Sequence, residues 1–256
     1  MAKVITFANQ KGGVGKTTTA HIVSIGIARK GFKVLACDLD PQANLTSVLG
    51  IDPDGELVSI NDLFEGNCDI GDAIMSTEAG VDLLVGSLML SGADRKFSKT
   101  GDEYKLKEAL KGIENKYDYI IIDTPPALGI MSLNALAATD FLVVVMTPDY
   151  FSTKGLKQFQ ETVDVTKKYL NNPNIKINGL LLTRCDRTNL SSIINEDVNE
   201  AAKALNTKIF KSRIRQGVAI RESQYLESSL FDMKDTGVLD DYNAFIKELM
   251  KEVKNK

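Results

Sequence analysis

The sequence predicts an α/β protein built on a doubly wound, mostly parallel sheet flanked by helices. Three observations lead to this fold class. Six short apolar runs alternate with stretches of helical spacing along the 256 residues. These runs are too continuously apolar for half-exposed strands, so they suit a parallel sheet covered on both faces. A glycine-rich turn separates the first apolar run from the first helical stretch.

The individual elements follow from this alternation. The strands are predicted at residues 4–8, 34–37, 81–85, 119–122, 141–146 and 177–182. Helical spacing of apolar residues predicts helices over 17–30, 104–113, 131–138 and 153–170. Residues 86–102 are polar and weakly patterned, and we expect a surface excursion there. A terminal helix is predicted over 240–256, with an apolar side made of Phe245, Ile246, Leu249, Met250 and Val253.

The composition predicts one globular domain covering residues 1–256. The chain is 43% hydrophobic and 25% charged, and single α/β domains commonly reach this length. No apolar stretch approaches the ~20 residues that span a bilayer, and the first strand leaves no room for a signal peptide. We therefore expect a cytoplasmic protein. Its three cysteines lack the paired spacing of a metal site, and its net charge of −3 argues against a generally basic nucleic-acid coat.

The glycine-rich turn is a phosphate-binding loop, Lys11-Gly-Gly-Val-Gly-Lys-Thr-Thr18. Its glycines allow several backbone N–H groups to face a polyphosphate at a helix N-terminus. We expect Lys16 to reach the β- and γ-phosphates and the Thr17 hydroxyl to bind Mg²⁺. The fold is thus that of a P-loop NTPase. The nucleotide-binding residues predicted in the loop are Gly12, Gly13, Val14, Gly15, Lys16, Thr17 and Thr18.

Two positions at the entrance of the loop depart from the strict pattern. Gln10 stands where that pattern has a glycine, and Lys11 is a second lysine. Most P-loop proteins lack this second lysine, so the two departures restrict the chain to a subset of P-loop proteins.

Two carboxylates follow the second predicted strand, in the segment Cys37-Asp-Leu-Asp-Pro-Gln-Ala-Asn44. Side chains at i and i+2 of an extended segment point the same way, so one can face a metal and the other an attacking water. We assign Asp38 to outer-sphere Mg²⁺ contacts and Asp40 to polarising that water against the γ-phosphate. The alternative is that Asp40 before Pro41 only caps the next helix.

Asp123 ends the strongly apolar run 119–122, as the second metal-site carboxylate of a P-loop enzyme does. The predicted metal residues are therefore Thr17, Asp38 and Asp123. Thr124 and the two prolines after it stiffen a turn that could sense the γ-phosphate, because such segments commonly transmit nucleotide state.

Together these three segments resemble the ParA/MinD family of deviant Walker ATPases, with the best match to ParA-type (Soj-like) partition ATPases. The loop with Lys11 is similar to the deviant Walker A motif. Asp38-Leu-Asp-Pro-Gln-Ala-Asn is similar to switch I, and Asp123-Thr-Pro-Pro to Walker B and switch II. The similarity continues through 133–140, 148–155 and 181–184, so it covers most of the chain.

This resemblance implies an ATPase that hydrolyses ATP to ADP and phosphate with Mg²⁺. It implies a homodimer in which two ATP-bound subunits meet face to face and Lys11 crosses to the partner's phosphates. Lys11, Lys16 and Asp40 are then the catalytic residues, and Thr183 and Arg213 join the nucleotide site. The ATP-bound dimer would bind double-stranded DNA nonspecifically on the nucleoid. A ParB-like or other centromere-binding protein would stimulate hydrolysis and release it.

The larger plasmid partition ATPases carry a helix-turn-helix domain before the first strand. Here the first strand begins close to Met1, so we expect no such domain. DNA binding is accordingly expected to tolerate any sequence and to rest on phosphate contacts.

A basic stretch indicates where DNA would bind. Residues 201–221 contain six basic residues and no acidic ones, which favours a phosphate-backbone footprint joined by lysines of the terminal helix. The alternative is a solvated face with one or two nucleotide contacts. The candidate DNA contacts are Lys203, Lys208, Lys211, Arg215, Arg221, Lys247 and Lys251.

The main alternative function is a MinD-like positioning ATPase on a membrane. Those relatives end in a basic amphipathic helix that lies on lipid, whereas this terminal helix also carries Asp240, Asp241, Glu248 and Glu252. Anionic lipid would repel this mixed polar face, so we expect the apolar side to pack in the core and no membrane partner. A small-molecule ligase with the same loop is another possible function. The sequence also leaves open whether the cargo is DNA or a protein assembly.

Overall fold

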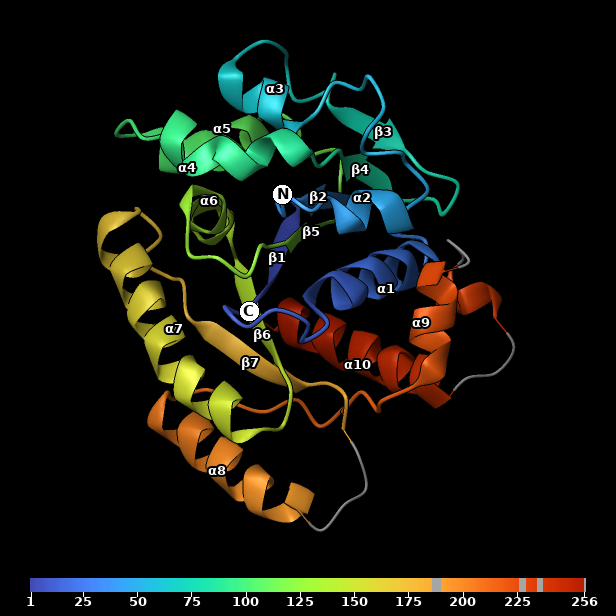
Figure 1. Ribbon diagram of the computed structural model, residues 1–256, viewed down its shortest axis with the longest axis vertical. Coiled ribbons are helices and arrows are strands. Elements are labelled where there is room, and N and C mark those ends of the chain that lie inside the picture. Colours follow the sequence, from blue (N-terminus) through green and yellow to red (C-terminus); the bar gives the residue numbers. More distant parts are fainter. Residues whose placement is uncertain (186–189, 226–228, 234–236, 256) are drawn as a thin grey trace.

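A seven-stranded sheet lies at the centre of the computed structural model, which describes residues 1–185, 190–225, 229–233 and 237–255 (Figure 1). The strand order is β3-β4-β2-β5-β1-β6-β7. β3 is antiparallel to β4, and the other pairs are parallel. The strands are β1 (Lys3–Ala8), β2 (Val34–Asp38), β3 (Ile74–Ser76), β4 (Asp82–Leu84), β5 (Tyr119–Asp123), β6 (Phe141–Met146) and β7 (Ile177–Leu182). This confirms the predicted mostly parallel α/β sheet.

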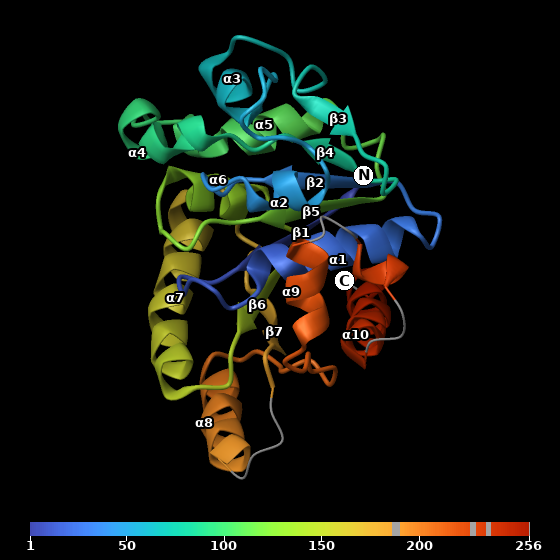
Figure 2. The same ribbon diagram turned by 45° about the vertical axis from the view of Figure 1, so that its right-hand side comes forward.

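Helices cover both faces of the sheet (Figures 1 and 2). One face packs against α1 (Lys16–Ala28) and α10 (Gly237–Lys254), with α9 (Val218–Tyr225) and the turn η3 (Leu230–Asp232) at their side. The other helices are α2 (Asn44–Val48), α3 (Ile60–Glu65), α4 (Ala93–Lys96), α5 (Lys105–Lys111), α6 (Ile130–Ala138), α7 (Tyr150–Tyr169) and α8 (Leu190–Ala204), with the turns η1 (Leu88–Gly92) and η2 (Asp102–Tyr104). The opposite face packs against α3 to α8.

The central strands are apolar throughout because both of their faces are covered. All five residues of β5 and all six of β6 are buried. The pairing of β2 with β5 places Asp38 beside Asp123 at the carboxyl ends of both strands. This edge of the sheet is where open α/β proteins bind ligands.

Residues 86–102 correct one expectation. Instead of a surface excursion, this segment forms η1 and α4 and inserts Leu90, Ala93 and Phe97 into the core. The Phe97 ring packs edge-on against Phe64 of α3, with 5.6 Å between ring centroids. Three apolar anchors spread over short helical turns are too few to produce a readable helical period.

The predicted terminal helix is confirmed, although it runs from Gly237 to Lys254 and not over 240–256. α10 buries Phe245, Ile246, Leu249, Met250 and Val253, together with Tyr242. The apolar side of this helix is therefore part of the core.

Gly179 in β7 lets an aromatic ring lie directly against the strand. A Cβ at this position would lie 2.5 Å from Cε2 of Phe210, and Phe210 is buried edge-on against Phe245. We expect Gly179→Ala to lower the free energy of unfolding by about 1–3 kcal/mol through overpacking, as measured by urea denaturation. Gly112→Ala is the matched control, because its Cβ would meet only a carbonyl at 3.6 Å. Equal unfolding midpoints for the two variants would contradict this packing argument.

Candidate nucleotide site

The phosphate-binding loop joins β1 to α1 at the carboxyl edge of the sheet. Gly13 and Gly15 have φ angles of 73° and 92°, a region that glycine adopts without strain. α1 begins at Lys16 directly after Gly15. Because the first N–H groups of a helix lack intrahelical partners, this turn offers donors to an anion.

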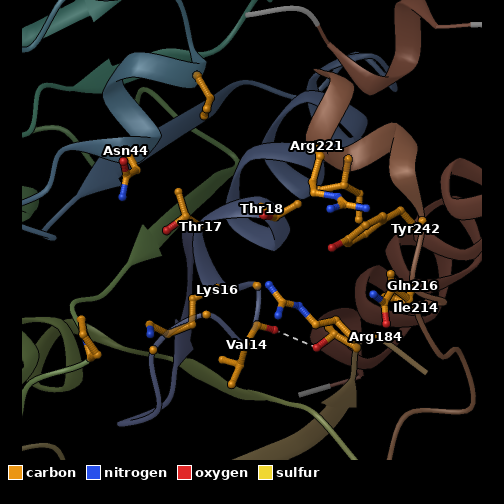
Figure 3. Close-up of a pocket in the computed structure, with 18 of the residues that line it drawn as sticks. Val14, Lys16, Thr17, Thr18, Asn44, Arg184, Ile214, Gln216, Arg221 and Tyr242 are labelled. Atoms are coloured by element: carbon orange, nitrogen blue, oxygen red, sulfur yellow. Dashed lines mark hydrogen bonds between the residues drawn. The ribbon is translucent and has the colours of Figure 1, made fainter. Parts of the chain in front are cut away.

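A cavity of about 660 Å³ opens in front of the loop (Figure 3). This volume is in the range of small-molecule sites. In Figure 3, Lys16 and Asn44 lie on one side of the cavity, while Arg221, Tyr242 and Gln216 lie on the other. Of the residues predicted from the sequence, the lining includes Gly12, Gly13, Val14, Gly15, Lys16, Thr17, Thr18, Asp40 and Thr183.

Two buried carboxylates lie beside the loop. Oδ2 of Asp38 accepts hydrogen bonds from the Thr46 backbone N–H at 2.8 Å and hydroxyl at 2.9 Å, and Oδ1 accepts from the Asp40 N–H at 3.2 Å. Burial raises the pKa of Asp38 to about 6. Burial and then the charge of Asp38 raise the pKa of Asp123, whereas a hydrogen bond from Thr17 lowers it.

These residues suit a divalent cation. Oδ2 of Asp123 is buried and has no hydrogen-bond partner among the described residues. Together with the neighbouring Thr17 hydroxyl, it offers the hard oxygen donors that Mg²⁺ prefers. Asp38 has both oxygens engaged by Thr46 and Asp40, which fits a contact through water better than a direct one.

Lys16 is a cation held inside the protein. It is 6% exposed, and its Nζ lies 3.4 Å from the Lys11 carbonyl oxygen. Burial lowers its pKa, while Asp123 and Asp40 act in the opposite direction. A buried ammonium at the wall of an open cavity calls for an anionic ligand.

Asp40 lies in a turn and does not cap a helix. Its Oδ1 accepts from the Gln42 N–H at 3.0 Å. The next helix, α2, begins after Ala43 and has no side-chain cap. The helix-cap alternative is therefore not what the structure shows, and the Asp40 carboxylate lines the cavity.

Lys11 is not among the residues that line the cavity of its own chain. Its Nζ lies 2.8 Å from Oδ2 of Asp149, which follows β6. Its backbone N–H donates to Oδ1 of Asn9 at 2.9 Å, while Nδ2 of Asn9 donates to the Val145 carbonyl. The loop entrance is thus tied to β6.

The far wall of the cavity comes from the segment after β7. The Thr183 hydroxyl donates to the Val14 carbonyl at 2.7 Å, so it supports the loop from behind (Figure 3). The Ile214 N–H donates to Leu182 and its carbonyl accepts from Cys185, and the wall begins at Ile214. Arg213 precedes this wall and is exposed outside the lining, in contrast to its predicted place at the nucleotide.

Several lining residues were not predicted from the sequence, or were predicted for another role. Arg184, Gln216, Ile220 and Tyr242 were missed, and Arg215 and Arg221 were assigned to DNA. Arg184 could have been predicted, as could the lining residues Asn44 and Pro126, because all three stand in segments that resemble the family. The others depend on how α9 and α10 pack, which local patterns do not reveal.

Acidic side chains of α10 form hydrogen bonds and ion pairs with residues 208–215 of the basic stretch. Arg215 forms a bidentate pair with Asp241, with nitrogen–oxygen distances of 2.8 and 2.9 Å. Glu248 accepts from the Lys211 and Ser212 N–H groups at 2.9 Å each. Lys208 forms an ion pair with Glu252. These contacts give part of the predicted DNA footprint a role within the fold.

The other predicted DNA contacts lie on different elements. Lys203 on α8 is exposed, as is the Lys211 side chain, while Arg221 lines the cavity. Lys247 and Lys251 are exposed on the outer side of α10.

Sequence comparison finds related proteins along most of the chain. A family model described as an AAA domain matches residues 2–177. The sporulation initiation inhibitor protein Soj of Bacillus subtilis is 38% identical over 226 residues, covering 87% of this chain and 88% of Soj. The chromosome partitioning protein ParA of Myxococcus xanthus is 34% identical over 255 residues, covering 98% of this chain and 89% of that protein.

Solved structures share the fold. One is a cobyrinic acid a,c-diamide synthase from Mycobacterium smegmatis with bound ADP and magnesium, at 32% identity and a TM-score of 0.86, covering 99% of this chain and 96% of that one. Another is a putative plasmid partition protein from Borrelia burgdorferi bound to AMPPNP, at 26% identity and a TM-score of 0.80, covering 98% and 100%. Within the described ranges, every helix is too short or too polar to span a bilayer.

Proposed function

Because this chain belongs to the ParA and Soj family of P-loop partition ATPases, we propose that Mg²⁺ and ATP drive it into a homodimer that binds double-stranded DNA nonspecifically. Hydrolysis to ADP and phosphate, stimulated by a ParB-like or other centromere-binding protein, then releases the DNA. The observation that carries the proposal is the buried Lys16 ammonium in an open cavity beside Asp38 and Asp123. Residues 1–256 act as one P-loop ATPase domain in the cytoplasm, on the nucleoid.

The metal and the phosphates are held by separate residues. Thr17 and Asp123 would hold Mg²⁺ directly and Asp38 would do so through water, and the metal would neutralise phosphate charge. The backbone of Gly12 to Thr18 cradles the phosphates, and Lys16 adds its charge. Asp40, oriented by the Gln42 N–H, positions the attacking water.

Lys11 acts on the nucleotide of the partner subunit. In the single chain it is paired with Asp149 and lies outside the lining of its own cavity. An exposed pair of this kind contributes only about 0.2–1 kcal/mol, so a partner's triphosphate can replace it. A cation supplied in trans then neutralises charge that develops during phosphoryl transfer.

Lys11→Ala is expected to lose ATP-dependent dimerisation, as measured by light scattering with AMPPNP. Asp149→Asn is the matched control, because it breaks the same ion pair but keeps the lysine. It is expected to dimerise, with a midpoint within about fivefold of wild type. Unchanged dimerisation of Lys11→Ala would refute the role in trans. Equal loss in both variants would instead assign the effect to the ion pair within the chain.

The DNA surface is proposed to include the outer side of α10. Lys247 and Lys251 are exposed there, whereas Lys208 and Arg215 are engaged by acidic residues of the same helix. Replacing Lys247 and Lys251 with alanine should weaken ATP-dependent DNA binding and reduce its log–log salt slope by about one for each phosphate that is no longer neutralised. Lys208→Ala is the comparison, with an expected unchanged slope. Fluorescence anisotropy measures both slopes. A reduced slope for Lys208→Ala with an unchanged slope for the Lys247 and Lys251 variant would instead place the DNA contacts in the 208–215 segment.

A membrane-bound MinD-like role is less well supported. The apolar side chains of α10 are buried against the sheet, so this helix does not present them to lipid. Vesicle binding with ATP, in the absence of DNA binding, would favour that role. One structural neighbour is named a cobyrinic acid a,c-diamide synthase, and a small-molecule ligase of that kind would need its acceptor acid for turnover. Hydrolysis with Mg²⁺ and ATP alone therefore distinguishes the proposed ATPase from such a ligase.

A further inference from the structure

Gln10 carries a buried amide group without a hydrogen-bond partner. Its Nε2 atom is one of two buried side-chain atoms in the described part of the chain that lack one, and the other is Oδ2 of Asp123. Buried polar groups in folded proteins are nearly always paired, so each exception needs an explanation. The metal site explains Asp123, whereas the nucleotide site as described so far makes no use of Gln10.

The surroundings of Gln10 point to the segment after Asp123. Gln10 lines a second, narrow and mainly apolar cavity, whose wall is formed on one side by Thr124, Pro125 and Pro126. Pro126 also lines the nucleotide cavity. The 124–126 segment therefore borders both cavities through Pro126, and a ligand in the larger cavity can contact the segment there.

This segment offers acceptors for the amide. No hydrogen bond between described residues ends on the carbonyl oxygens of Thr124, Pro125 or Pro126. The next carbonyl, of Ala127, already accepts from the Ser132 hydroxyl at 2.6 Å. The unpaired amide nitrogen and these carbonyl oxygens thus belong to residues that line the same small cavity.

We propose that Gln10 is a positioning residue for ATP binding. When a γ-phosphate in the larger cavity shifts the 124–126 segment, the Gln10 amide donates to one of its carbonyls and fixes the segment beside the phosphate. The inference rests on the proposed function, because it requires ATP in that cavity. ADP lacks the γ-phosphate, so the bond is not made with ADP. Gln10 therefore raises affinity for ATP and leaves affinity for ADP unchanged.

Gln10→Met tests this because it keeps the length of the side chain and removes the donor. With Mg²⁺ present, calorimetry should show about fivefold weaker binding of AMPPNP and unchanged binding of ADP. The Tm of the nucleotide-free protein should stay level or rise, because an unpaired buried donor is removed.

Gln160→Met is the matched control. Its amide donates to Asp164 at 2.9 Å on the exposed side of α7, so all three measurements should match wild type. Unchanged AMPPNP binding by Gln10→Met, or equal weakening for both nucleotides, overturns the inference while the proposed function stands. A lower Tm with unchanged affinities would make Gln10 merely structural. If wild type binds neither nucleotide, the proposed function fails, and the inference fails with it.

Discussion

Replacing Lys16 with alanine is expected to weaken AMPPNP binding at least about 100-fold and to abolish the ATP-dependent dimer. The Lys16 ammonium is buried at the wall of the nucleotide cavity, and removing one partner of a buried charge pair costs about 3–5 kcal/mol. Calorimetry measures the affinity, and light scattering measures the dimer. Because burial lowers the pKa of Lys16, its removal should not destabilise the nucleotide-free chain.

Lys30→Ala provides the control for this experiment. Lys30 is exposed just after α1, so this variant removes a lysine from the same region without touching the cavity. It should bind AMPPNP and dimerise as wild type does. Retained AMPPNP affinity in Lys16→Ala would contradict the phosphate-binding role of the loop.

Asp40→Ala is expected to dimerise with ATP and to hydrolyse it at least about 100-fold more slowly. The Asp40 carboxylate lines the cavity and is assigned to positioning the attacking water, and losing such a group typically costs a factor of about 10²–10⁴. Steady-state phosphate release measures the turnover, and light scattering with ATP measures the dimer.

Asp52→Ala is the matched control, because Asp52 accepts from the Asp54 N–H at 3.0 Å. This is the same local turn that Asp40 makes with Gln42, but Asp52 is not among the residues that line the cavity. It should hydrolyse ATP at the wild-type rate. Wild-type turnover by Asp40→Ala would refute the assignment.

The strand pattern explains why part of the site could be predicted from the sequence. Parallel strands end at the same edge, so the carboxylates at the ends of two apolar runs were expected at one edge of the sheet, where the pairing of β2 with β5 places Asp38 beside Asp123. The loop could also be predicted, because its glycine spacing is a local property of the chain.

The remaining parts of the site depend on contacts between distant segments. Arg215 was assigned to DNA from charge alone, whereas Asp241, 26 residues later, engages it at the cavity wall. The pairing of Lys11 with Asp149 spans 138 residues, and no local pattern encodes it. Residues 86–102 were read as surface because most of their side chains are polar, yet three apolar ones anchor the segment in the core.

α10 contributes to the core, to the cavity wall and to the exposed surface. Its apolar side chains pack on the sheet, its acidic residues Asp241, Glu248 and Glu252 hold the 208–215 segment, and Lys247 and Lys251 stay exposed. A helix that supports the cavity wall on one side and offers lysines on another is well placed to link nucleotide state to the DNA binding that we propose.

The most direct test of the proposed function is the retention of Asp40→Ala on mixed-sequence duplex DNA, with ATP and with ADP, over a series of salt concentrations. Retention should require ATP, and the logarithm of the binding constant should fall steeply and linearly with the logarithm of salt concentration. Equal and negligible retention with both nucleotides would contradict a DNA-bound ATP state. It would then direct attention to vesicles or a protein surface as the matrix.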